Sequence, residues 1–160
     1  MLYMSNHQYK ATITWTGNLG TGTSGYRAYG RNHVINIEGK PEIPGSSDPS
    51  FRGDATRYNP EEMLVASLST CHMLWYLHLC AEAGVIVVDY VDKATGTMTE
   101  TADGSGYFSE VTLHPAVVVT DAGMIDKANE IHHRANKLCF IANSVNFPVH
   151  HQPTCRVQNA

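Results

Sequence analysis

Residues 59–84 carry the sequence NPEEMLVASLSTCHMLWYLHLCAEAG, which contains both a start signal and a stop signal for a helix. Asn59 is a residue type that caps helices, Pro60 suits the first helical position, and Glu62 completes a capping box three residues after the cap. Gly84 suits the left-handed turn that ends a helix. We therefore expect one long helix between these two ends, of roughly 24 residues and about 36 Å.

This predicted helix is apolar around its whole circumference. Its apolar residues are Leu64, Val65, Ala66, Leu68, Met73, Leu74, Trp75, Leu77 and Leu79. A helix that is apolar on every side must be buried on every side, and a single chain of 160 residues would struggle to wrap it. We therefore expect a second copy of the chain to cover part of the helix, which predicts a homodimer.

Alternation of apolar and polar residues predicts strands on both sides of the helix. Residues 9–15 show the pattern most clearly, since every second residue is apolar. Residues 103–106, Asp-Gly-Ser-Gly, suit a hairpin turn, so we expect an antiparallel meander after the helix. The predicted strands are residues 9–15, 26–37, 85–88, 94–101, 108–120 and 155–158.

A second, amphipathic helix is predicted to begin after Asp121, which can cap it. Its apolar residues recur at spacings of three and four and are Ile125, Ala128, His132, Ala135, Leu138 and Cys139. Residues 39–57, rich in proline, glycine and serine, predict a long surface loop. No repeat interrupts the chain, so residues 1–160 are expected to form a single domain. Its class is α+β, because strands and helices are segregated along the sequence.

Composition excludes several classes of protein. Hydrophobic residues make up 42% of the chain and charged residues 16%, which excludes disorder. A net charge of -4 argues against a nucleic-acid partner. The sequence shows neither an apolar run of about 18 residues, as a membrane span needs, nor the features of a signal peptide. We therefore expect a soluble cytoplasmic protein with no membrane partner.

The four cysteines are Cys71, Cys80, Cys139 and Cys155. No two of them form a Cys-x-x-Cys motif, which excludes the thioredoxin motif and the common zinc-knuckle patterns. In a reducing compartment such thiols are buried small hydrophobes, ligands or reactive groups. Cys80 and Cys155 have no motif around them and are interpreted as structural. Cys71 lies in the middle of the long helix, and this position by itself predicts a core residue.

The surroundings of Cys71 change that interpretation. Residues 57–72, RYNPEEMLVASLSTCH, resemble the Asn-Pro-Glu-Glu…Cys signature of the OsmC/Ohr family, the osmotically inducible and organic hydroperoxide resistance proteins. Residues 138–144, LCFIANS, are similar to the second cysteine segment of the family, although there proline commonly follows the cysteine and here Phe140 does. The resemblance implies an OsmC-like fold, in which antiparallel sheets wrap around long central helices in an intertwined homodimer.

The resemblance also implies a cysteine-based peroxidase, a hydroperoxide reductase of the oxidative stress response. Cys71, as the thiolate, attacks the peroxide and becomes a sulfenic acid, and Cys139 condenses with it to form a disulfide. An external dithiol, of the lipoyl type or a small thiol, restores both cysteines. The expected substrates are organic hydroperoxides, with hydrogen peroxide as a further candidate. No metal, haem, flavin or other cofactor is expected.

The thiolate needs a nearby positive charge, because a thiol of pKa about 8.5 is mostly protonated at neutral pH. In the hydroperoxide resistance branch, an arginine in the loop after the first strand supplies this charge. Here residues 17–25 contain four glycines and no arginine. The remaining candidates are Arg27, Arg31, Arg52 and Arg57. We select Arg31, which lies at a break between strands.

The family's arginine is oriented by a glutamate that matches Glu61. Ten residues of helix separate Glu61 from Cys71, a rise of about 15 Å. If both residues serve one site, Glu61 must come from the partner chain or the helix must bend. As a carboxylate in the first turn, Glu61 would also stabilise the helix through its dipole.

Two other functions stay open. The missing loop arginine favours an OsmC-fold protein that binds a small apolar ligand and has no physiological peroxidase activity. Nine histidines suggest a metal protein, with adjacent pairs at 132–133 and 150–151. Neither these pairs nor His72 and His78, six residues apart, supply the i, i+4 spacing of a chelating pair, so no metal site is predicted. His72 could tune the neighbouring thiol or pack in the core.

Overall fold

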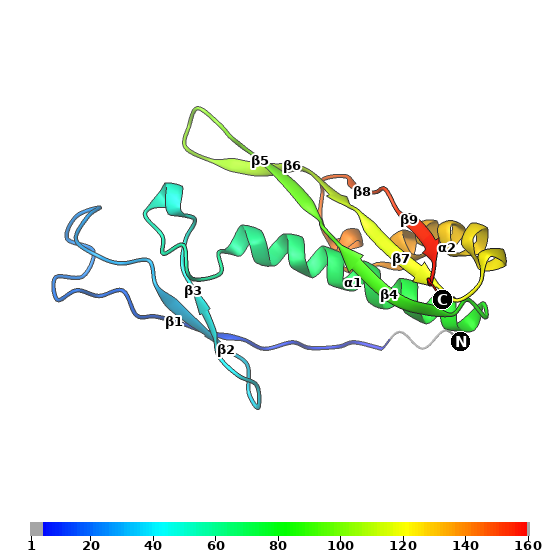
Figure 1. Ribbon diagram of the computed structural model, residues 1–160. Helices are drawn as coiled ribbons and strands as arrows, with labels where there is room; N and C mark the ends of the chain where they lie inside the picture. Colours follow the sequence, from blue (N-terminus) through cyan, green and yellow to red (C-terminus); the bar gives the residue numbers. More distant parts are fainter. Residues whose placement is uncertain (1–4, 160) are drawn as a thin grey trace. The chain divides into compact units, whose positions relative to one another are not determined.

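The computed structural model describes residues 5–159 and contains strands and helices of a mixed α+β fold (Figure 1). The chain divides into a first unit, which ends at Met63, and a second unit, which begins at Leu64. The second unit contains the predicted cysteine residues. The single-domain organisation expected from the sequence stays a prediction.

The first unit contains an antiparallel sheet of three short strands, β1 (Thr12–Trp15), β2 (His33–Asn36) and β3 (Ile43–Gly45), in that order. β1 confirms the second half of the strand predicted at 9–15. The strand predicted at 26–37 forms only as β2. β3 lies in the predicted loop, and Pro44 within it is tolerated because β3 is at the edge of the sheet.

Helix α1 (Pro60–Glu82) begins and ends close to the predicted residues. The backbone N–H of Glu62 donates to Oδ1 of Asn59 at 2.8 Å, and the N–H of Asn59 donates to Oε2 of Glu62 at 3.2 Å. These two bonds are the predicted capping box. Gly84 takes the left-handed conformation at φ 70° just after the helix, as expected.

Replacing Asn59 with alanine removes the cap of α1. We expect Asn59→Ala to lower the free energy of unfolding by about 1 kcal/mol, because buried Asn59 satisfies a backbone N–H of the first turn. Asn59→Asp keeps a side-chain oxygen at the same place and serves as the control. Urea denaturation measures both. Equal losses in the two variants would show that the cap is not what Asn59 contributes.

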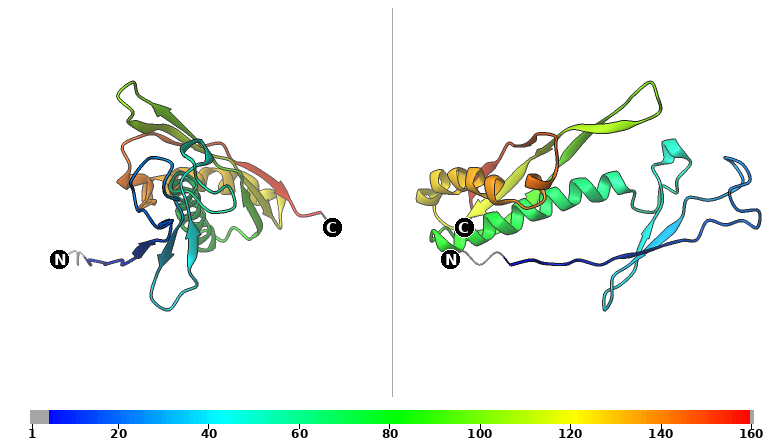
Figure 2. Two further views of the ribbon diagram at one scale, coloured as in Figure 1. Left: turned by 90° about the vertical axis from the view of Figure 1, so that its left-hand side faces the viewer. Right: turned by 180° about the vertical axis from the view of Figure 1, so that it is seen from behind.

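The second unit is built on a long antiparallel ribbon. β4 (Val87–Asp92) pairs with β7 (Pro115–Val119), and β5 (Thr95–Glu100) pairs with β6 (Gly106–Leu113) across the predicted hairpin turn. The strand expected at 108–120 is divided at His114, whose backbone N–H donates to Oδ1 of Asp92 at 2.6 Å instead of continuing the ladder. The turn between β5 and β6 projects away from the helices (Figure 2).

Two parallel strands complete the sheets of this unit. β8 (Val149–His151) pairs with β6 and β9 (Thr154–Val157) pairs with β7, which gives the strand orders β5-β6-β8 and β4-β7-β9. β9 confirms the predicted final strand. The predicted antiparallel pairing is confirmed, but the order of a meander is wrong, because β4 pairs with β7 and not with β5.

Helix α2 (Ile125–Leu138) follows a 3-10 turn (Ala122–Met124) that is capped by the side chain of Asp121. Cys139, predicted to lie on this helix, is the first residue after it and has an extended backbone. A further 3-10 turn, Ala142–Ser144, follows, and another, Pro49–Phe51, lies in the first unit.

The core of the second unit lies between α1, α2 and the sheet β4-β7-β9, which Figure 1 shows beside the two helices. Its buried residues come from all three and are Tyr76, Leu79, Cys80, Val85, Val117, Val119, Ala128, Ile131 and Ala135. A second cluster of Leu68, Val111 and Leu113 joins α1 to β6. Both clusters hold α1 by the same face, because its buried residues recur every three or four positions.

The remaining circumference of α1 is less well covered than the sequence predicts. Leu74 projects away from the buried face and is 59% exposed. By length and composition α1 could cross a membrane, although the core helix of a soluble protein passes the same test. The burial expected on every side of α1 is therefore not supplied by the described residues of one chain.

Candidate functional site

The structure brings Cys71 and Cys139 together. Cys71 lies in the middle of α1 and is half-buried, whereas Cys139 follows the end of α2 and is 1% exposed. Both are free thiols, and they lie close enough together for the Cys71 side chain to raise the pKa of Cys139. Two cysteines 68 residues apart in the sequence therefore form one dithiol site.

Cys139 is held in the protonated form. Burial raises its pKa to about 11, and the neighbouring Cys71 thiol acts in the same direction. The backbone N–H groups of Ile141 and Ala142 oppose this shift, and that of Ala142 lies 3.5 Å from the Cys139 sulfur. Cys139 is therefore a shielded thiol at neutral pH, and Cys71 is the more accessible of the two sulfurs.

An aromatic pair lies next to the cysteines in the sequence. Trp75, one helical turn after Cys71, contacts Phe140, the residue after Cys139, edge to face with ring centroids 5.4 Å apart. Phe140 is 66% exposed. The residue that departs from the proline of the family's segment thus adds apolar surface near the dithiol, which suits an apolar ligand better than a charged one.

A group of imidazoles, which we call the histidine cluster, lies beside the dithiol site. Its members are His72, His132, His133 and His151. Nε2 of His72 and Nδ1 of His132 are hydrogen-bonded at 2.9 Å, and both rings are buried. His151 lies 5.7 Å from His72 between ring centroids and is hydrogen-bonded to His133 at 3.3 Å. Periodicity predicted the apolar position of His132, but its partner on α1 was not predicted.

Both buried histidines are neutral at physiological pH. Burial, and then the neighbouring His151, lowers the pKa of His72 to about 4, against the opposing effect of Asp92. Burial, and then His72, lowers the pKa of His132 to about 3. His72 therefore cannot supply the positive charge that a thiolate at Cys71 needs. Within residues 5–159, no three histidine, cysteine or acidic side chains are placed to hold a metal ion.

Arg31 lies in the first unit and organises its own loop. Its guanidinium donates to the carbonyl oxygens of Tyr29 at 2.6 Å and Tyr26 at 2.8 Å. The same group lies over both aromatic rings, 4.0 Å and 4.6 Å from their centroids. These contacts lie within residues 26–31, which are outside the strands of this unit although the sequence predicted a strand there.

Arg52, Arg57 and Glu61 also lie in the first unit. Arg57 forms an ion pair with Asp54 at 3.5 Å, and Arg52 lies 6.0 Å from the Tyr26 ring. Glu61 is in the first turn of α1, where Glu62, not Glu61, makes the cap bonds. The roles of Arg31 and Glu61 at the cysteines stay predictions.

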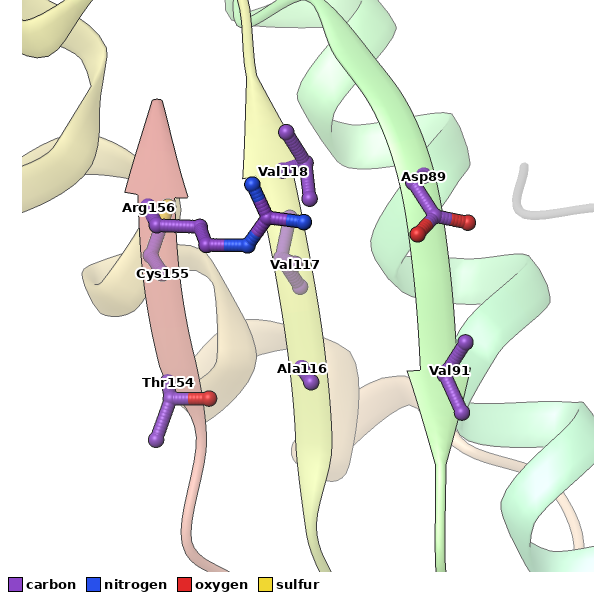
Figure 3. Close-up of a pocket in the computed structure, with 8 residues that line it drawn as sticks. All are labelled: Asp89, Val91, Ala116, Val117, Val118, Thr154, Cys155 and Arg156. Carbon is purple, nitrogen blue, oxygen red and sulfur yellow. The ribbon is translucent and has the colours of Figure 1, made fainter. Parts of the chain in front are cut away.

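A hollow lies on the face of the sheet β4-β7-β9 that includes Asp89 and Arg156 (Figure 3). The Arg156 side chain extends from β9 across β7, and the Asp89 carboxylate projects from β4 on the same face (Figure 3). The lining residues are Asp89, Val91, Ala116, Val117, Val118, Thr154, Cys155 and Arg156. Neither Cys71 nor Cys139 lines this hollow, so it is separate from the dithiol site.

The chain is similar to known proteins of one family. Residues 53–153 match a family model described as OsmC-like protein. An OsmC-like protein of unknown function from Vibrio cholerae is 30% identical, with a TM-score of 0.83 over 93% of this chain and 100% of that one.

Two further solved structures share the fold at lower identity. An organic hydroperoxide resistance protein from Elizabethkingia anophelis is 17% identical, with a TM-score of 0.69 over 98% of this chain and 100% of that one. One from Legionella pneumophila is 14% identical, with a TM-score of 0.70 over 95% and 98%. A search among curated proteins found no match.

Proposed function

Because this chain belongs to the OsmC-like protein family, we propose that it is a thiol-dependent peroxidase that reduces organic hydroperoxides. The observation that carries the proposal is the dithiol site, in which a half-buried Cys71 lies beside a shielded Cys139. Proteins with the same fold from two organisms are organic hydroperoxide resistance proteins, which favours this substrate class. The apolar contact of Trp75 with Phe140 favours apolar hydroperoxides.

The two sulfurs divide the reaction between them. The Cys71 thiolate attacks one oxygen of the peroxide, the O–O bond breaks, and the alkoxide leaves and takes up a proton as an alcohol. Cys71 is then a sulfenic acid. The Cys139 sulfur attacks it, and the hydroxyl group leaves as water with the Cys139 proton, which forms the disulfide. An external dithiol reduces this disulfide by exchange and becomes oxidised itself.

The proposal needs a cation at Cys71, and Arg31 with Glu61 as its orienting group is our candidate. His72 is excluded from this role because it is neutral. The exposure of Leu74 supports a homodimer in which a second chain covers α1 and contributes to the site. A cytoplasmic location is part of the same proposal, since the chemistry requires a reducing compartment.

Mass spectrometry tests the dithiol chemistry directly. After one equivalent of cumene hydroperoxide, we expect the protein to lose two hydrogens, with peptide mapping that joins Cys71 to Cys139. In Cys139→Ser the sulfenic acid cannot be resolved within the chain, so dimedone should label Cys71. A disulfide between other cysteines would refute the pairing. A protein that stays reduced would favour the alternative function, binding of a small apolar ligand.

A further inference from the structure

We infer that His72 and His132 are positioning residues for the dithiol site, because their hydrogen bond fixes how α1 and α2 cross and so holds Cys139 against Cys71. This inference deepens the proposed function and rests on it. It assigns a role to two buried polar side chains that the peroxidase chemistry does not use directly.

Both pairs of residues connect the same two segments. His72 follows Cys71 directly on α1, and His132 lies on α2 seven residues before Cys139, which follows the end of that helix. The cysteine contact and the histidine contact are therefore about 10 Å apart along the direction of α2, and both are made to α1. Two contacts at this separation determine both the position and the rotation of α2 on α1.

The histidine contact is directional. The rings of His72 and His132 are nearly coplanar, with an interplanar angle of 3°, and their nitrogens are 2.9 Å apart. Tyr76, one turn after His72, stacks on the other side of the contact, with its ring centroid 3.9 Å from that of His132. The His132 ring of α2 therefore makes two contacts with α1: a hydrogen bond to His72 at its edge and stacking with Tyr76 on its face.

The apolar contacts around the His72–His132 hydrogen bond are not directional. One core cluster between α1 and α2 contains apolar side chains, among them Leu79, Ala128 and Ala135. Apolar burial is non-directional, so it tolerates small shifts of one helix along the other. In the described part of the chain, His72 with His132 is the side-chain hydrogen bond that joins these helices. A shift of α2 would leave both imidazoles buried without a partner, which is costly.

Disulfide formation is sensitive to such a shift. The Cα atoms of a disulfide are usually about 4.4–6.8 Å apart, and pairs beyond about 7 Å cannot be bridged without backbone movement. Cys139 lies just after the end of α2, so its position follows that of the helix. Loss of the histidine bond should therefore slow the condensation with Cys71, whereas the attack of Cys71 on peroxide does not require α2 to be in place.

The test measures the effective concentration of the Cys71–Cys139 dithiol in a glutathione redox buffer, without peroxide. His132→Phe keeps a ring that can stack on Tyr76 but removes the hydrogen bond, and we expect the effective concentration to fall at least tenfold. His132→Asn places an amide near the position of Nδ1 and should restore it to within threefold of the unmodified protein. His78→Leu, at an exposed position of α1, is the matched control and should leave the effective concentration unchanged.

A second readout separates positioning from folding. In the His132→Phe variant, cumene hydroperoxide should oxidise Cys71 at the normal rate. The dimedone-reactive sulfenic acid should then accumulate, because Cys139 condenses with it slowly. A folded His132→Phe protein with an unchanged effective concentration would overturn the inference. If His132→Phe does not fold, the His132→Asn variant decides. An effective concentration in His132→Asn that differs more than threefold from that of the unmodified protein would then overturn the inference.

The proposed function can fail independently. If the disulfide of the unmodified protein forms readily in the glutathione redox buffer but hydroperoxides give no turnover, the peroxidase is refuted and the positioning role remains.

Discussion

Cys71→Ser should reduce hydroperoxide turnover by about a thousandfold or more, because a serine hydroxyl is a far weaker nucleophile toward the O–O bond than a thiolate. The measurement is kcat/KM with a dithiol reductant and cumene, tert-butyl and hydrogen peroxides as substrates. In the unmodified protein, the order of the three rates sets the substrate class. The apolar pair of Trp75 and Phe140 favours cumene hydroperoxide.

Two further variants make this result specific to the dithiol site. Cys155→Ser removes a half-buried thiol in β9 and should leave turnover unchanged. Cys139→Ser should still react once with peroxide but recycle poorly with the dithiol. Undiminished turnover in Cys71→Ser would remove the peroxidase hypothesis and leave the binding of a small apolar ligand as the better interpretation.

The protein should lose stability between about pH 6.5 and pH 4, because its buried histidines are neutral when folded. An unfolded histidine binds a proton below its ordinary pKa of about 6.5. His72 and His132 bind one only at pKa values of about 4 and about 3. Their contribution to stability is therefore full above pH 6.5 and is lost as the pH falls toward those values.

The size of this effect follows from the shifts. One pKa unit corresponds to about 1.4 kcal/mol, so His72 alone accounts for roughly 3 kcal/mol between pH 7 and pH 4. Urea denaturation at pH 7 and pH 5 measures most of the change. Asp48, Asp54 and Asp103 have lowered pKa values because of hydrogen bonds from Ser50, Thr56 and Thr101, respectively, and they affect stability only at lower pH.

Removing one imidazole should flatten this pH dependence. His132→Asn removes one of the two buried histidines, His72 and His132, that bind a proton at pH 5 only when the chain is unfolded, so the difference in stability between pH 7 and pH 5 should shrink. His78→Asn, at an exposed position of α1 outside the core, is the control for the loss of a surface imidazole. Equal stability of the unmodified protein at both pH values would contradict the neutral, buried state of the pair.

Several features of the fold could be predicted because they depend on neighbouring residues. The capping box joins Asn59 and Glu62, three positions apart, and Gly84 ends the helix through its own backbone conformation. The hairpin turn between β5 and β6 depends likewise on a few consecutive residues. The family resemblance rested on the same helix and is confirmed by the family model.

Other features could not be predicted because they depend on pairing between distant segments. β3 and β8 are three residues long, too short for alternation to show, and each exists because it lies against a longer strand. His114 divides the strand predicted at 108–120 through its bond to Asp92, 22 residues earlier. The end of α2 before Cys139 was missed because the apolar spacing continues past the last helical turn.

The amino-acid sequence was sufficient to establish the long apolar helix, its two ends, the position of Cys71 on it and the family to which the chain belongs, since these follow from local backbone preferences and a contiguous motif. Packing was needed to place Cys139 beside Cys71 and to bury His72 against His132 in neutral form. Contacts across 60 or more residues depend on how helices and sheets exclude water from a shared core, and no short stretch of residues contains that information.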